Sequence, residues 1–216
     1  MKKNYLVIGS VLLMVLIFAI AAFIYNSRQT QKQIKQATEQ SGALIRAHSP
    51  RKGNPDAKVT IVEFMDPACE TCAKFHPFVK KLMASHPGKV NLVIRYAAFH
   101  QGSDLMVKIL EAVKKQGKFW EVLEKMFETQ PYWASHHNPQ PQAFWNYLQR
   151  SGFDMAYLEK AINDPEIIKV LERDQADIRR LGVNKTPTFF VNGKPLPSFG
   201  YEQLATLVNA EVAANY

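Results

Sequence analysis

Two cysteines, Cys69 and Cys72, are the only cysteines in the 216 residues, and they stand three positions apart. They follow the β-rich segment Val59–Phe64 and precede a helical pattern, so the pair falls where a strand ends and a helix begins. Unpaired N–H groups and the helix dipole at such an N-terminus favour a negative charge, so the first sulfur can ionise near neutral pH. The spacing predicts thiol–disulfide exchange, in which Cys69 attacks and Cys72, one turn deeper, resolves the mixed disulfide.

Metal binding is the alternative chemistry for the same residues. A C-x-x-C pair can be half of a zinc site, and His76 lies four residues after Cys72. No further cysteine completes a thiolate set, and a purely structural disulfide across two residues would be strained. A copper-binding or metal-tolerance protein, with Cu(I) as the soft cation that suits thiolates, therefore stays open as the alternative function. The neighbouring His136 and His137 are interpreted as part of a surface loop.

The remaining pattern predicts an α/β fold of the order βαβ, helical insertion, ββα. A second strand is expected at Val90–Tyr96, and the crossover helix between the two strands implies that they are parallel. Residues 101–182 contain amphipathic helices and no convincing strand. Thr188–Val191 is the next expected strand, and Asn192-Gly193 predicts a hairpin turn into a returning strand at Pro195–Phe199. A closing helix follows.

The N-terminus predicts a single transmembrane helix over residues 6–24, which form an uncharged run. As a helix this run spans about 28 Å, close to the thickness of a bilayer core. Tyr5 and Tyr25 bracket it, and Lys2 and Lys3 precede it, which keeps the N-terminus cytoplasmic and sends the rest outward. A cleaved signal peptide is the alternative, because Ala19-Ile20-Ala21 has the small-x-small form. Either way the bulk of the chain is exported, to a compartment where disulfides form.

We therefore expect three regions: an anchor at 1–25, a polar spacer at 26–54, and an α/β domain at 55–216. A faint heptad-like spacing makes residues 26–48 the only candidate for weak self-association. The net charge of +8 does not indicate nucleic-acid binding, because residues 1–48 carry six Lys or Arg and one acidic residue. The rest of the chain, with 21 basic and 18 acidic residues, is nearly balanced.

Several positions together resemble the thioredoxin superfamily, and the helical insertion resembles its DsbA-like thiol:disulfide oxidoreductases of bacterial envelopes. The resemblance covers about residues 50–216. Pro77 matches the proline that kinks the first helix. Thr186-Pro187 matches the pair whose proline is cis and faces the active site, and which implies binding of an extended substrate segment. Glu63 matches a buried acidic residue beneath the second cysteine.

In that position Glu63 would have a raised pKa and could relay a proton to or from Cys72. The other interpretation is a glutamate on an edge strand that points to water. The sequence departs from the family at Glu70-Thr71, where strong oxidants carry a histidine that stabilises the thiolate. Glu70 places a negative charge beside Cys69 instead, partly offset by Lys74, so we expect a thiol pKa and a reduction potential between those of the strong oxidants and thioredoxin.

The resemblance implies an enzyme of the inner membrane, single-pass, with its catalytic domain facing the periplasm or the cell exterior. Its substrates would be cysteine pairs of exported proteins, and a redox partner in the membrane or envelope would reset it. No organic cofactor or metal is expected for this chemistry. The direction of the reaction, as oxidase, reductase or isomerase, depends on that partner.

Overall fold

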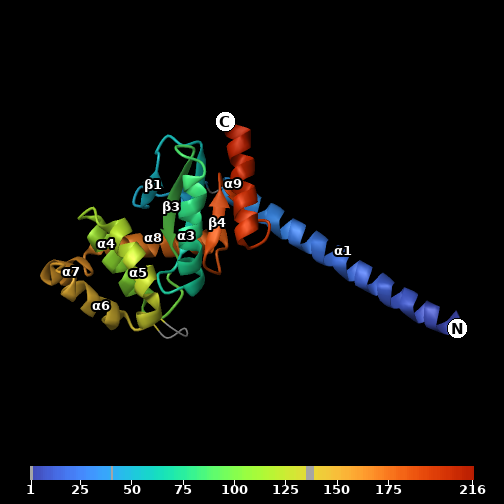
Figure 1. The fold of residues 1–216 in the computed structure, drawn as a ribbon, viewed down its shortest axis with the longest axis horizontal. Helices are drawn as coiled ribbons and strands as arrows, with labels where there is room; N and C mark the ends of the chain where they lie inside the picture. Colours follow the sequence, from blue (N-terminus) through green and yellow to red (C-terminus); the bar gives the residue numbers. More distant parts are fainter. Residues whose placement is uncertain (1, 40, 135–138) are drawn as a thin grey trace.

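A mixed five-stranded sheet lies at the centre of the protein, with helices on both faces (Figure 1). The computed structural model describes residues 2–39, 41–134 and 139–216. The strands lie in the order β1-β3-β2-β4-β5, in which β2 and β3 are parallel and the other neighbouring pairs are antiparallel. They are β1 (Arg51–Gly53), β2 (Val59–Met65), β3 (Val90–Tyr96), β4 (Thr188–Val191) and β5 (Lys194–Pro195). The predicted α/β class with a parallel βαβ unit is confirmed.

The two faces of the sheet bury different helices, because alternate side chains of each strand point to opposite sides. On one face, Ile61 and Met65 of β2 pack in a core shared with α3 and α9. On the other face, Phe64 packs with residues of α2 and α8. These four helices are α2 (Ser41–Leu44), α3 (Glu70–Ala84), α8 (Pro165–Leu181) and α9 (Tyr201–Asn215).

The helical insertion lies beside the sheet, at the end where β3 terminates (Figure 1). As the sequence predicted, no strand occurs among the described residues between β3 and β4. Besides α8, the insertion contains α4 (Ser103–Lys114), α5 (Phe119–Trp133), α6 (Pro141–Arg150) and α7 (Met155–Ala161). Helix α5 contacts α3, and this contact brings the insertion to the cysteine pair.

Helix α1 (Lys2–Glu39) carries the predicted anchor and continues without a break into the predicted spacer. Among the described side chains, Leu13–Lys32 is long and apolar enough to cross a membrane. Its apolar side chains face solvent: Phe18 is 78% exposed and Phe23 is 76% exposed. In Figure 1, α1 leaves the domain as a single rod that ends at the N-terminus.

The folded domain begins before residue 54, the expected end of the spacer. Ala43 and Leu44 are buried against α8, and β1 pairs with the edge of β3. The sequence did not predict this earlier start, because neither feature is long enough to form a periodic pattern. One is a pair of apolar residues, and the other is a three-residue edge strand that includes Arg51 and Lys52. Because Leu44 is buried within its own chain, it is not available for the self-association considered for residues 26–48.

The predicted Asn192-Gly193 turn is present, with both residues at positive φ (48° and 82°). This conformation matches the twist of a tight hairpin. The returning strand β5 is shorter than the expected Pro195–Phe199 and ends at Pro195. Pro195 and Pro197 have no N–H group to donate, so the ladder cannot continue.

A buried ionic cluster joins β3 to α8 on the face away from α3. The guanidinium of Arg95, with 0% exposure, donates to Asp174 Oδ1 and to Asp177 Oδ2, both at 2.7 Å. Arg46 adds a second ion pair to Asp177 at 2.6 Å, and His48 Nε2 lies 2.6 Å from Asp174 Oδ1. Burial opposes ionisation of Asp174, yet the hydrogen bonds of His48 and Arg95 hold its pKa below the ordinary value. The cluster fixes the segment after α2 onto the sheet.

Replacement of Arg95 tests the weight of this cluster. Arg95→Leu leaves two buried carboxylates without the one fully buried cation that they share, and we expect the free energy of unfolding to fall by about 3–5 kcal/mol. Arg173→Leu on the exposed side of α8 is the matched control, with an expected change within about 0.5 kcal/mol. Urea unfolding of the two variants measures the difference, and an equal effect would contradict the assigned role.

Candidate active site

Cys69 is the N-cap residue of α3, the position that the sequence predicted. Its Sγ accepts a hydrogen bond from the backbone N–H of Cys72, at 3.3 Å. In the thiol form, Sγ also donates to the carbonyl oxygen of Thr186, at 3.4 Å. Strand β2 ends at Met65 and a short turn then leads into α3, so the sulfur lies directly at the positive end of the helix.

This geometry lowers the pKa of Cys69 to about 6 from an ordinary value of 9.0. The largest cause is the hydrogen bond from the Cys72 side chain, which burial opposes; Thr186 and backbone N–H groups lower the pKa further. Cys72 is fully buried, and burial together with the neighbouring negative charge raises its pKa well above the ordinary value. Of the two sulfurs, Cys69 is therefore ionised at neutral pH and Cys72 keeps its proton.

The lowered pKa of Cys69 has the direction that the sequence predicted for a sulfur at a helix N-terminus. A pKa and a reduction potential between those of the strong oxidants and thioredoxin stay a prediction for this motif, which lacks the family's histidine. Glu70 itself is exposed, so water screens its charge. The lowered pKa of Cys69 therefore depends mainly on its contacts with Cys72 and Thr186. Lys74 is likewise exposed.

Glu63 is in the middle of the sheet, because β2 pairs with β3 on one side and β4 on the other. It is 1% exposed, which excludes the interpretation as an edge-strand residue in water. Burial, with a smaller contribution from the charge on Cys69, raises the pKa of Glu63 to about 8. The charge of Glu63 also raises the pKa of Cys72, so the two groups interact electrostatically.

The Thr186–Pro187 peptide bond is cis, as the resemblance implied. Thr186 is half-buried and presents its carbonyl oxygen to Cys69, while Pro187 is buried immediately before β4. The structure thus brings four of the five predicted site residues together by direct contact or by adjacency in the sequence: Cys69, Cys72, Thr186 and Pro187. The fifth, Glu63, lies on the central strand β2 and interacts electrostatically with Cys72.

Two further residues hold the turn that carries Cys69, and the sequence analysis missed both. The buried carboxylate of Asp66 accepts from the N–H of Ala68 at 2.8 Å and of Phe99 at 2.7 Å. It also contacts His100 and Ser103, which explains the position of His100. The buried Gln130 of α5 donates to the carbonyl oxygens of Pro67 and Cys69, at 2.8 and 3.2 Å.

The signal for Asp66 was available, since a carboxylate directly after a buried strand needs partners. Gln130 has no such signal, because one glutamine in an amphipathic helix is usually solvated.

His76, which the alternative metal site would need as its third ligand, contacts residues of α5 instead of the cysteines. The His76 ring packs against Phe127, with centroids 5.2 Å apart, and its Nε2 lies 4.0 Å from Glu124. Burial lowers the pKa of His76 to about 4. Within the described part of the chain, no three His, Cys, Asp or Glu side chains form a group that could hold a metal ion. His136 and His137 lie outside the described residues.

The hydrogen bond from Cys72 can be tested by comparing two substitutions of that residue. Cys72→Ala removes the donor, and we expect the pKa of Cys69 to rise from about 6 by about one unit. Cys72→Ser keeps a hydroxyl donor and should stay closer to the wild type. Thiolate absorbance at 240 nm, followed against pH, gives each pKa. Identical pKa values in the two variants would show that the side-chain hydrogen bond is unimportant.

The raised pKa of Glu63 makes stability depend on pH. Between its ordinary pKa of 4.5 and its folded value of about 8, the folded protein holds a proton that the unfolded chain releases, so stability falls as pH rises. Over this pH range the free energy of unfolding of the wild type should fall by an amount on the order of 4 kcal/mol. Glu63→Gln removes this dependence on pH. Urea unfolding of both reduced proteins at pH 5 and pH 8 should therefore show the variant gaining stability relative to the wild type. Parallel pH profiles would contradict the assignment.

Comparison with known protein families identifies a thioredoxin model that matches residues 46–210. Among curated proteins, a Na(+)/H(+) antiporter NhaA of Herminiimonas arsenicoxydans is 30% identical over 67% of this chain. The chain spans only 22% of that antiporter's length, so the similarity concerns one part of it. The antiporters' transport activity is not transferred by this match.

Two other comparisons extend over most of the relative. Disulfide bond formation protein D of Bacillus subtilis is 27% identical, over 81% of this chain and 84% of that protein. The crystal structure of oxidised BdbD from Bacillus subtilis superposes with a TM-score of 0.67 at 26% identity, over 77% of this chain and 94% of that one. With the helical insertion and the cysteine pair in place, the chain belongs to the thioredoxin family, and its structural neighbours are DsbA-like oxidoreductases.

Proposed function

We propose that this protein is a membrane-anchored thiol:disulfide oxidoreductase that acts on cysteine pairs of exported proteins. The observation that carries the proposal is the position of Cys69, whose sulfur caps α3 and faces the carbonyl oxygen of Thr186. A sulfur with a pKa of about 6 is mostly thiolate at neutral pH, which is the form that attacks a disulfide. The similarity to a disulfide bond formation protein supports the same activity.

The proposed cycle uses the different acidities of the two sulfurs. In the direction of reduction, the Cys69 thiolate attacks one sulfur of a substrate disulfide, and the other substrate sulfur leaves as a thiolate. Cys72 then loses its proton and attacks Cys69, which closes the Cys69–Cys72 disulfide and releases the second substrate sulfur. Oxidation of a substrate dithiol is the same sequence in reverse. Thr186 and Pro187 would hold the substrate segment beside Cys69.

Glu63 is proposed as the group that takes the proton from Cys72. While Cys69 is a thiolate, its charge helps to keep Glu63 protonated. A mixed disulfide at Cys69 has no charge, so Glu63 then releases its own proton to solvent more readily, and the carboxylate that forms can accept the proton of Cys72. This coupling follows from the effect of the Cys69 charge on the pKa of Glu63 and of the Glu63 charge on the pKa of Cys72.

The anchor is assigned to residues 6–24, with the catalytic domain on the outer side of the membrane. The exposed apolar side chains of α1 support this assignment, since an apolar helix is stable when lipid covers it. A redox partner in the membrane or envelope would then reset the Cys69–Cys72 pair. No metal or organic cofactor takes part in the proposed cycle.

Substitution of Cys69 tests the proposal. In insulin reduction and in oxidation of reduced ribonuclease, Cys69→Ser should lose at least about a thousandfold in rate, because the remaining sulfur, that of Cys72, is buried and keeps its proton. Lys81→Ala, on the exposed far end of α3, is the control and should keep the wild-type rate.

The metal content of the purified protein separates the proposal from its alternative. Stoichiometric copper without exchange activity in the wild type would contradict the enzyme and favour metal binding. Exchange activity that persists unchanged in Cys69→Ser would contradict the assigned nucleophile.

A further inference from the structure

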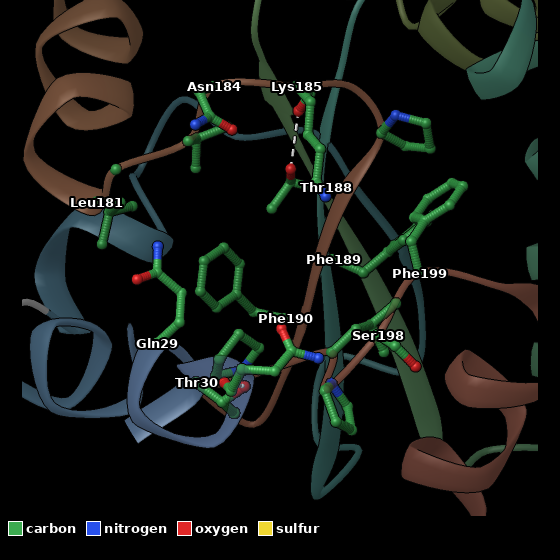
Figure 2. A pocket seen from close by; sticks show the side chains of 17 residues that line it. Gln29, Thr30, Leu181, Asn184, Lys185, Thr188, Phe189, Phe190, Ser198 and Phe199 are labelled. Atoms are coloured by element: carbon green, nitrogen blue, oxygen red, sulfur yellow. Dashed lines mark hydrogen bonds between the residues drawn. The ribbon is translucent and has the colours of Figure 1, made fainter. Parts of the chain in front are cut away.

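A cavity of about 390 Å³ lies between helix α1 and the segment that carries the cis proline (Figure 2). From α1, Asn26, Gln29 and Thr30 line it. From the rest of the chain, the walls come from residues 181–185, 187–190 and 195–199. In Figure 2, Gln29 and Thr30 extend from the helix on one side, while Lys185 and Thr188 lie on the other. The anchor helix is therefore one wall of a pocket in the domain.

The pocket and the site around Cys69 meet at the cis peptide bond, where Pro187 lines the pocket and Thr186 does not. The sulfur of Cys69 contacts the carbonyl oxygen of Thr186, and Pro187, the next residue, lines the pocket. An extended segment whose cysteine reaches Cys69 would run along Thr186 and Pro187, and its neighbouring residues would enter the pocket. Phe190 and Phe199 provide apolar surface there, and amide and hydroxyl groups of α1 provide uncharged polar surface.

The position of the pocket along α1 coincides with the end of the apolar run. Asn26 is the first residue along the described chain that lines the pocket, and the uncharged run ends at Ile24. At a rise of about 1.5 Å per residue, these two points are only about 3 Å apart along an unbroken helix. With residues 6–24 as the span proposed above, the pocket lies at the level where the chain leaves the bilayer.

The charges near this junction suit a membrane surface. Arg28 and Lys32 are exposed on the same part of α1, and Lys185 is exposed at the pocket. Arg179 and Arg180 form the last turn of α8, which ends at the pocket wall. Basic side chains next to a membrane span are attracted to anionic lipid headgroups, and they would hold the domain close to the bilayer.

We propose that this pocket binds the segment next to a reactive cysteine in a client chain that is itself inserted in, or emerging from, the same bilayer. This inference rests on the function proposed above and specifies its substrate class. The anchor helix would then do more than tether the enzyme: it forms part of the binding site and keeps that site within reach of membrane-proximal cysteines.

Spacing of the cysteine from the membrane tests this inference. The full chain with Cys72→Ala is placed in phosphatidylethanolamine/phosphatidylglycerol vesicles, with transmembrane probe peptides that carry one cysteine as a thionitrobenzoate disulfide. The Cys69 thiolate attacks the peptide sulfur, a Cys69–peptide disulfide forms, and thionitrobenzoate leaves and is measured at 412 nm. One peptide has its cysteine five residues outside the span, within an extended reach of about 17 Å; another has it thirty residues outside.

We expect the five-residue peptide to react at least about tenfold faster than the thirty-residue peptide, because its effective concentration at the pocket is higher. Equal rates, or a faster reaction of the thirty-residue peptide, would overturn the inference while leaving the proposed function in place. A soluble peptide with the same disulfide is the reference for chemistry. Absence of its reaction would contradict the proposed function itself.

Two matched substitutions test the wall of the pocket. Gln29→Phe adds bulk inside the cavity, whereas Gln31→Phe makes the same change two residues along α1, on a different face. We expect Gln29→Phe to slow the five-residue peptide about fivefold and Gln31→Phe to have an effect below about twofold. Iodoacetamide, which needs no pocket, should label Cys69 equally in both variants. Equal peptide rates in the two variants would overturn the assignment of the pocket.

Discussion

The negative charge on the sulfur of Cys69 is the feature on which the rest of the site depends. That charge is stabilised only if the sulfur stays at the N-terminus of α3, within 3.3 Å of the N–H of Cys72. Three separate parts of the chain maintain this position. Asp66 accepts a hydrogen bond from the N–H of Ala68 in the turn before α3. Gln130 of the helical insertion donates to the carbonyl oxygen of Cys69, and the carbonyl oxygen of Thr186, in the loop before β4, contacts the sulfur itself. The thioredoxin core alone supplies the first and third, and the insertion supplies the second.

The opposite face of the sheet has a different role, which is to attach helix α1 to the domain. Arg95 lies on β3, adjacent in register to Phe64, and gathers Asp174 and Asp177 of α8. The carbonyl oxygen of Ala43 accepts from the same guanidinium, and Arg46 binds Asp177. The chain just after α1 is therefore fixed by buried charges rather than left as a flexible spacer. This is the structural condition for α1 to form a wall of the pocket beside Pro187.

The sequence predicted most of the elements because their signals are local. The apolar runs of β2, β3 and β4, and the periodic faces of the helices, each fall within a few residues. The residues that hold the site and helix α1 in place depend on partners far away in the chain. Arg95 meets Asp174 across 79 residues, and Gln130 meets Cys69 across 61 residues. The periodicity of a segment contains no information on such distant pairs, so the sequence did not single out Arg95 or Gln130.

Burial also determines which groups of the site are ionised. At neutral pH, Cys69 is ionised, whereas Cys72 and Glu63 hold their protons because both are buried beside that charge. A second negative charge in this interior would be costly, since little water reaches it. In the proposed cycle, formation of a mixed disulfide removes the charge from Cys69. Glu63 can then release its own proton to solvent, and the resulting carboxylate accepts the proton of Cys72, so the site never holds two negative charges at once. In this proposal the order of the proton transfers follows from burial, because the two buried groups, Glu63 and Cys72, lose their protons only after Cys69 has reacted and lost its charge.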